Sequence, residues 1–278
     1  MNQTFSPTRF GRLLRTHISD NRGQLLANFS LLVGGMFILG VFIYQASPRV
    51  VQDERTILFF VLGWACLYVF TVQQTTVLNQ KERAVNYIMR PASQIEKVIL
   101  IWLVSGLGFM LVYPVVFYGM DSLGVSFVNN RKWTPQQLNM IRLQGGVFQL
   151  KSFFVAENIS KIGTRFWVLT ALLHPFASTF SLLVRRHTLP LVVVIAFTLL
   201  IFGYLANNFL LHVLTGTETI GTGVPFTEAS VESPVQQYQY RRINLPQPIG
   251  NLLRYGVGIV VITLLYVTAY FRLKEREV

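Results

Sequence analysis

The strongest constraint in this sequence is a set of apolar runs, each about as long as a membrane is thick. The run at 25–44, LLANFSLLVGGMFILGVFIY, has 20 residues and no charged side chain. A helix needs about 20 such residues to cross a hydrocarbon core of about 30 Å. The sequence therefore predicts six transmembrane helices, at 25–44, 56–73, 98–120, 166–184, 189–214 and 251–271.

The composition agrees with an all-α polytopic membrane protein. Hydrophobic residues make up 52% of the 278 residues and charged residues 13%, whereas about a quarter of the residues in soluble domains are charged. In such a chain the net charge of +12 indicates basic loops beside anionic lipid rather than nucleic-acid binding. The single cysteine, Cys66, leaves no disulfide framework. We expect one domain, 1–278, in a lipid bilayer.

Residues 1–24 are expected to form an amphipathic helix on the membrane surface. Ser6 is a candidate N-cap, and Pro7 suits the first helical position. Apolar side chains recur from Phe10 with helical spacing, while arginines occupy another face. Such a helix lies in the interface with its basic side toward lipid headgroups.

The distribution of lysine and arginine predicts the orientation of the chain. Thirteen of these residues lie on the side that holds both termini and the segment 79–96, and ten lie on the other side. The positive-inside rule then places both termini in the cytoplasm. The long segments 121–164 and 215–250 become extracytoplasmic. Within the first of them, Thr134, Pro135 and Gln137 predict a short capped helix.

Three breaks in helical regularity are also expected from local residue types. Pro114 predicts a kink in the third span, and His174 with Pro175 predicts a break in the fourth. Between the second and third spans, segment 79–96 is charged and contains Pro91, which ends a helix before it. Ser93 followed by Glu96 forms a capping box, so a new helix begins near Gln94 and continues into the third span. We interpret 79–96 as a cytoplasmic lever attached to that span.

Several kinds of chemistry are missing from the sequence. None of the six lysines follows a glycine, so the chain has no phosphate-binding P-loop. The predicted spans hold no charged side chain away from their ends, which weighs against an ion-coupled secondary carrier. The four histidines lack metal-ligand spacing. A Ser105–His174 hydrolase lacks a nucleophile-elbow pattern. We therefore expect neither catalytic nor metal-binding residues and no cofactor in this chain.

Asn207 and Asn208 form the most polar pair within the apolar runs. They are candidates for a translocation path or for hydrogen bonds across a dimer seam. The alternative is that they lie near the outer headgroups or satisfy each other and a neighbouring helix.

The lever and the layout of spans resemble a known family. YIMRPASQIEKVI at 87–99 is similar to the "LPxSxxEK" segment of one branch of the type-2 ABC transporter permeases, with Pro91, Ser93, Glu96 and Lys97 on the motif. Arg90 stands where that branch has an apolar residue. The tail FRLKEREV and the turn VRRHTLP also look like that branch. The outer segment 121–164 is longer than the usual connection in the family.

This resemblance implies a function and partners. The chain would be the permease subunit of an ATP-driven exporter in the bacterial cytoplasmic (inner) membrane, paired with a second copy or paralogue. ATP would be bound by a separate nucleotide-binding subunit, which the lever would contact. The resemblance implies an ATPase-coupling interface at Lys81, Glu82, Arg83, Tyr87, Pro91, Ser93 and Glu96.

Two other functions remain open at this point. The two long outer segments are also compatible with a non-transporting membrane scaffold or assembly factor that binds extracytoplasmic partners. A secondary carrier is the third possibility, and the lack of coupling carboxylates argues against it.

Overall fold

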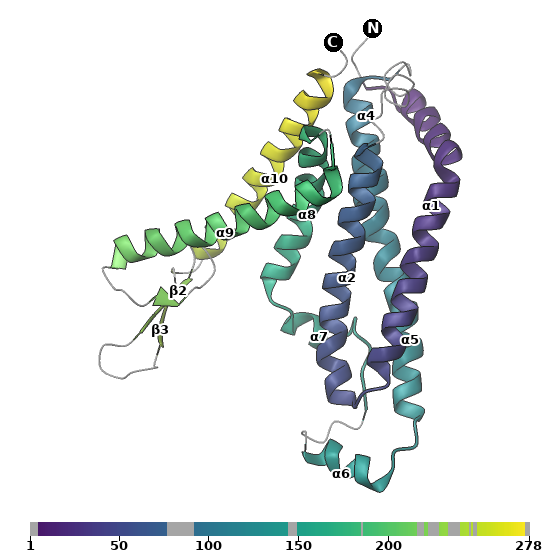
Figure 1. Ribbon diagram of the computed structural model, residues 1–278, viewed down its shortest axis with the longest axis vertical. Helices are drawn as coiled ribbons and strands as arrows, with labels where there is room; N and C mark the ends of the chain where they lie inside the picture. Colours follow the sequence, from purple (N-terminus) through teal and green to yellow (C-terminus); the bar gives the residue numbers. More distant parts are fainter. Residues whose placement is uncertain are drawn as a thin grey trace.

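The computed structural model describes residues 5–76, 92–143, 149–184, 186–215, 220–221, 228–232, 240–244, 246 and 249–275. Within these residues, six helices are long and apolar enough to cross a membrane. The prediction of a helical, multi-pass membrane fold is thus confirmed. Figure 1 shows most of these helices running side by side along the long axis of the molecule.

The first helix, α1 (Pro7–Tyr44), differs from the expected surface helix followed by a span. It is one continuous element of 38 residues, because residues 20–24 contain no proline that would interrupt it. Pro7 occupies the first turn as predicted, but the Ser6 side chain makes no capping hydrogen bond. The second helix, α2 (Pro48–Thr76), also begins earlier than predicted. Its first turns are helical because Val51 and Arg55 are buried against neighbouring elements.

The third span is a long helical rod, formed by α4 (Gln94–Ile101), η2 (Trp102–Gly108) and α5 (Phe109–Asn130). The middle part, η2, is a π-helix, in which backbone hydrogen bonds join residues five positions apart. Pro114 lies inside α5 without ending it. The helix continues past the predicted end at 120 because Val128 packs in a buried cluster with Tyr44, Val51 and Leu150.

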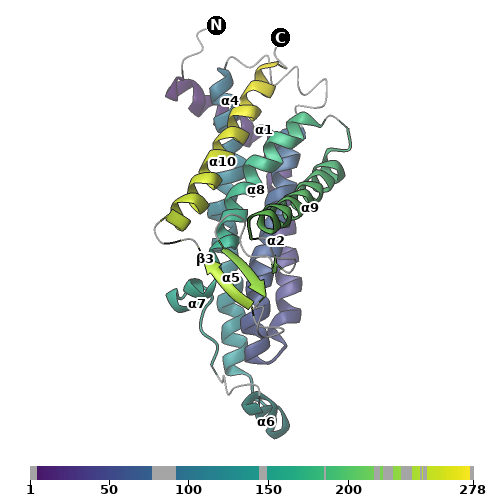
Figure 2. The ribbon, with the colours of Figure 1, turned by 90° about the vertical axis from the view of Figure 1, so that its left-hand side faces the viewer.

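Two short helices lie in the segment between the third and fourth spans. The first, α6 (Pro135–Leu143), is capped as predicted: Gln137 N–H donates to Thr134 Oγ1, and Thr134 N–H donates to Gln137 Oε1. The second is α7 (Ala156–Lys161). In Figures 1 and 2, α6 lies at the end of the molecule opposite the marked chain termini.

The fourth and fifth spans are α8 (Thr164–Leu183) and α9 (Thr188–Thr215). The predicted break at His174-Pro175 is wrong, because α8 runs through Pro175 as a continuous helix. The turn between the two helices places His187 at a φ of 49°. In Figure 1, α9 extends sideways from the other helices, and only 6% of its most apolar stretch is buried.

A small sheet precedes the last helix. Strands β1 (Ile220–Gly221), β2 (Glu228–Glu232) and β3 (Tyr240–Asn244) pair antiparallel in the order β1-β2-β3. Glu228 faces Asn244 and Ser230 faces Arg242 across the second pair. This sheet is an addition to the helical fold predicted from the sequence. It leads to α10 (Ile249–Glu275), the sixth apolar helix.

Both ends of the chain lie on the same side of the helical bundle. Leu13 near the start of α1 and Leu273 near the end of α10 belong to one buried cluster, together with Leu100, Leu182 and Ala269. We call the end of the bundle that contains this cluster the terminal end of the molecule. The opposite end, where α6 lies, is called the distal end.

Aromatic side chains form the core of the distal half. Phe59 of α2 contacts Phe117 of α5 and Phe153 of the following segment, with ring centroids 4.8 and 4.9 Å apart. Such ring pairs add to the free energy of burying their apolar surface. The core therefore joins two spans to the segment that connects α6 with α7.

Candidate functional site

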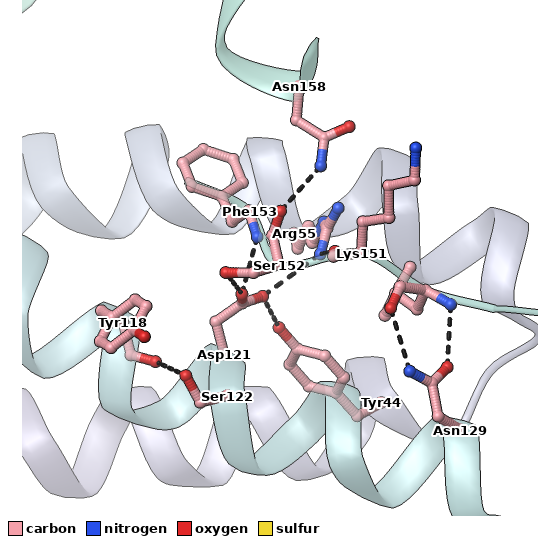
Figure 3. Close-up of polar contacts among 11 residues, drawn as sticks. Tyr44, Arg55, Tyr118, Asp121, Ser122, Asn129, Lys151, Ser152, Phe153 and Asn158 are labelled. Atoms are coloured by element: carbon pink, nitrogen blue, oxygen red, sulfur yellow. Dashed lines mark hydrogen bonds and ion pairs between the residues drawn. The ribbon is translucent and has the colours of Figure 1, made fainter. Parts of the chain in front are cut away.

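A buried carboxylate at the distal end holds three helical elements together (Figure 3). Asp121 of α5 accepts a hydrogen bond of 2.5 Å from the hydroxyl of Tyr44, the last residue of α1. Its other oxygen accepts the Phe153 backbone N–H at 2.8 Å and the Ser152 hydroxyl at 3.2 Å. Arg55 of α2 lies 3.4 Å from Asp121 Oδ1. We call these residues the Asp121 cluster.

Arg55 and Asp121 form an ion pair from which water is excluded, since their side chains are 1% and 0% exposed. A buried charge is tolerated only when partners replace its lost hydration. Asp121 has four such partners, and Arg55 also donates to the Lys151 carbonyl at 2.6 Å. The ion pair therefore connects α2 and α5 with the backbone of 151–153.

A second set of contacts holds the same segment, between α5 and α8, in place. The Asn129 amide donates to the Leu150 carbonyl at 3.0 Å and accepts the Leu150 N–H at 2.8 Å, as Figure 3 shows. The Arg131 guanidinium donates to the Gln45 carbonyl at 2.8 Å. Further along, Glu157 is paired with Lys151 and Lys161. Hydrogen bonding from these two ammonium groups, that of Lys151 first, lowers the pKa of Glu157 below its ordinary value.

Sequence reasoning missed the Asp121 cluster because its charges lie just beyond the ends of two apolar runs. A signal was present in the helical spacing. Val51, Arg55 and Phe59 recur every four residues and share one face of α2. Phe117, Asp121 and Gly124, at spacings of four and three residues, share one face of α5. A charge on an apolar stripe of this kind indicates a buried ion pair.

The contact between α1 and α5 beside this cluster requires a glycine. A Cβ atom at Gly124 would lie 2.5 Å from carbon atoms of the Tyr44 ring. Gly124→Val should therefore displace the ring and break the Tyr44–Asp121 hydrogen bond. We expect a loss of about 1 to 3 kcal/mol in unfolding free energy, measured by thermal unfolding in detergent. Gly119→Val is the matched control, since nothing lies within 4 Å of its Cβ position; equal losses in both variants would contradict this explanation.

A second buried carboxylate lies at the terminal end. The Ser93–Glu96 capping box predicted from the sequence is present: Glu96 N–H donates to Ser93 Oγ at 3.3 Å, and Ser93 N–H donates to Glu96 Oε2 at 2.9 Å. Glu96 also accepts the Ser6 backbone N–H at 2.8 Å. The Arg9 guanidinium donates to both carboxylate oxygens, at 2.7 and 2.8 Å.

Glu96 therefore has two structural functions at once. It starts α4, and it attaches the first turn of α1 to that start. Its side chain is fully buried, whereas that of Arg9 is 32% exposed. Charge-assisted, two-pronged bonds of this type are among the stronger polar contacts in proteins. We call Ser6, Arg9, Ser93 and Glu96 the terminal joint.

The structure does not locate the other residues of the predicted ATPase-coupling interface. Lys81, Glu82, Arg83, Tyr87 and Pro91 lie outside the described residues. Ser93 and Glu96 are described, and both face inward toward the terminal joint rather than outward.

Between the two ends, a chain of polar side chains crosses the spans. His174 of α8 is hydrogen-bonded through Nε2 to Ser105 Oγ, at 2.9 Å, and through Nδ1 to the Tyr266 hydroxyl of α10, at 2.8 Å. The Ser105 hydroxyl donates to the Ile101 carbonyl at 2.7 Å. The structure thus brings together the Ser105 and His174 pair considered from sequence.

The directions of these bonds argue for packing rather than nucleophilic catalysis. Because Ser105 gives its single hydroxyl proton to Ile101, His174 Nε2 must donate to Ser105 Oγ. His174 Nδ1 then accepts from Tyr266. In this arrangement His174 does not act as a base toward Ser105, as a nucleophile would require. These hydrogen-bonded side chains instead join α8 and α10 to the π-helix.

Asn207 and Asn208 are on the outlying helix α9. Asn207 is 5% exposed, and the buried Oδ1 atom of Asn208 has no hydrogen-bond partner. A buried, unsatisfied amide oxygen is costly. Most other side chains of α9 are exposed and apolar, including Phe197, Ile201 and Leu205.

The described residues contain no group of three or more His, Cys, Asp or Glu side chains arranged to hold a metal ion. Comparison with protein-family models, with curated proteins and with solved structures found no match for this chain.

Proposed function

We propose that this chain is the membrane subunit of an ATP-driven exporter of the ABC type, in the cytoplasmic membrane of a bacterium. The observation that carries the proposal is the terminal joint at the base of the third span. There Glu96 joins the N-terminal helix and the start of α4, which begins within the last residues of the charged segment 79–96. Energy would come from a separate ATPase subunit, since the sequence has no P-loop of its own.

The mechanical argument rests on the continuity of the third span. Helical backbone runs from Gln94 to Asn130, and it is held at its start by Glu96 and near its end by Asp121. A displacement of 79–96 by a partner would be transmitted along this rod to the distal end. The π-helix at Trp102–Gly108 is the part of the rod best suited to bend, because π-helical geometry is less regular than α-helical geometry.

A second copy or paralogue of the chain is also part of the proposal. The outlying helix α9 carries an apolar surface and the unsatisfied Asn208 Oδ1. Packing α9 against a second copy would cover the apolar surface.

Purification of the tagged chain from its native host tests the proposal. We expect a P-loop ATPase to co-purify and the isolated chain to hydrolyse no ATP. The double variant Lys81→Glu/Glu82→Arg should lose the ATPase, because it reverses two charges of the proposed contact. A wild-type chain that purifies without any P-loop protein, from membranes crosslinked before extraction, would overturn the proposal.

Glu96→Gln tests the mechanical part separately. The amide keeps the size of the side chain but loses the charge-assisted bonds to Arg9. We expect the ATPase complex to remain assembled while its activity in lipid nanodiscs changes by about tenfold, in line with typical coupling energies. The control is Glu275→Gln, an exposed carboxylate of α10 paired with Arg272. Unchanged activity in Glu96→Gln would show that the joint is not in the coupling path.

The scaffold function has one observation in its favour, which is the firm attachment of 149–155 to the Asp121 cluster. A segment held in this way presents a defined surface to an extracytoplasmic partner. Crosslinking from Lys161, which is 61% exposed, would favour this alternative if it captured envelope proteins in cells where no ATPase was attached to the chain.

A further inference from the structure

An apolar cavity of about 620 Å³ lies between α1, α2 and the third span. Its volume is within the range of about 300 to 1,000 Å³ that is usual for small-molecule sites. Side chains from three separate helices line it, among them Phe29, Ala65, Phe70 and Leu103.

The cavity extends along the axis of α1. Its lining on α1 reaches from Leu14 to Leu32, which at 1.5 Å per residue is about 27 Å. One leaflet of the hydrocarbon core is about 15 Å deep. The cavity is therefore long enough to hold an acyl chain that spans a whole leaflet.

The cavity also has a polar position along its length. Asn28 of α1 donates to Gln73 of α2 at 2.9 Å, and both residues line the cavity. Both side chains can make further hydrogen bonds beyond this one. Asn28 still has its amide oxygen and one N–H, and Gln73 still has its N–H donors. In a wall that is otherwise apolar, the pair can bind a carbonyl group.

Basic side chains continue the lining at the headgroup level. Arg15 and Arg22 are exposed, and they alternate at spacings of three and four residues with Ile18, Leu25 and Phe29, which line the cavity. All five therefore lie on one stripe of α1. Arg22 is about 15 Å along the helix from Leu32, so the lining between these two residues is about as long as one leaflet is deep.

We propose that this cavity is a binding site for one anionic phospholipid. An acyl chain fills the space between α1, α2 and the third span, Asn28 and Gln73 bind an ester carbonyl, and Arg15 and Arg22 bind the phosphate. An anionic phospholipid matches the charge, the polar position and the length of this cavity. A water-filled apolar cavity is unfavourable, whereas each methylene of an acyl chain buried there is favourable. It does not depend on the chain being a transporter.

Native mass spectrometry of the full chain tests the proposal. The protein is purified in detergent and titrated with dioleoylphosphatidylglycerol or dioleoylphosphatidylcholine. We expect one tightly held lipid, with the anionic lipid preferred. The double variant Arg15→Gln/Arg22→Gln should reduce that preference by about fivefold for each arginine. Asn28→Leu should weaken retention of both lipids alike.

Filling the cavity provides the complementary test. Ala65→Trp places an indole in the space from an exposed position of α2, and Val69→Trp does so one turn further along. Each should reduce the retained lipid roughly tenfold, as expected if about two methylenes are excluded. Leu205→Trp, on the exposed surface of α9, is the control and should change nothing.

Two results would overturn the proposal. One is a wild-type level of retained lipid in both filling variants, with their thermal unfolding unchanged. The other is an unaltered preference for phosphatidylglycerol after removal of both arginines. Neither measurement involves ATP or a partner subunit, so failure here is distinguishable from failure of the transporter proposal.

Discussion

Asp121→Ala is expected to be the most destabilising single change described here. It leaves the fully buried Arg55 without a counter-charge and removes the acceptor of the Tyr44 hydroxyl and the Phe153 N–H. Removing one member of a buried ion pair costs about 3 to 5 kcal/mol. We expect this loss in the free energy of unfolding, measured by tryptophan fluorescence during thermal or chemical unfolding in detergent.

Two further variants separate charge from general damage to the outer segment. Arg55→Met with Asp121→Asn removes both charges and keeps an acceptor for the Phe153 N–H, so it should be less destabilised than Asp121→Ala. Glu157→Gln alters an exposed carboxylate of α7 and should have little effect. If Asp121→Ala unfolded like the wild type, the ion pair would not hold the distal end together.

The second large effect is expected from Phe117→Ala. Phe117 is fully buried and lies within 5.2 Å, between ring centroids, of both Phe59 and Phe153. Truncating such a ring removes its buried surface and leaves a cavity, which together cost about 3 to 5 kcal/mol. The loss of packing would affect α2, α5 and the segment after α6, because all three contribute to this core.

The measurement is again the unfolding free energy, with limited proteolysis as a local readout. Cleavage after Lys151 should become faster in Phe117→Ala, because the neighbouring Phe153 loses its packing partner. Phe127→Ala is the matched control on the same helix, where the ring is 53% exposed. Similar destabilisation by the two variants would mean that the aromatic core does not anchor the outer segment.

The elements that could be predicted were those specified by neighbours in the sequence. The capping boxes of Ser93 with Glu96 and Thr134 with Gln137 were both predicted and are both present. A cap depends on residues three positions apart, so its energy is local. The proline predictions were weaker, since α8 continues through Pro175. Neighbouring helices can support a helix where one backbone bond is missing.

The candidate sites were less accessible from sequence, because their partners are far apart along the chain. Arg9 and Glu96 are separated by 87 positions, and Arg55 and Asp121 by 66. Nothing in the local pattern of either residue identifies the other. The prediction did find Glu96, but for its position in the capping box; its bonds to the N-terminal helix depend on how α1 and α4 pack.

The sequence by itself determined that this chain crosses a membrane with six helices, because long uncharged runs are stable in hydrocarbon only when their backbone is helical. It also determined where several helices begin, through caps that act over three residues. Only the tertiary structure decided which charges are buried together, that α1 is continuous, and that α1, α2 and the third span enclose an apolar cavity. These features depend on contacts between distant segments, and such contacts exist only once the helices have packed.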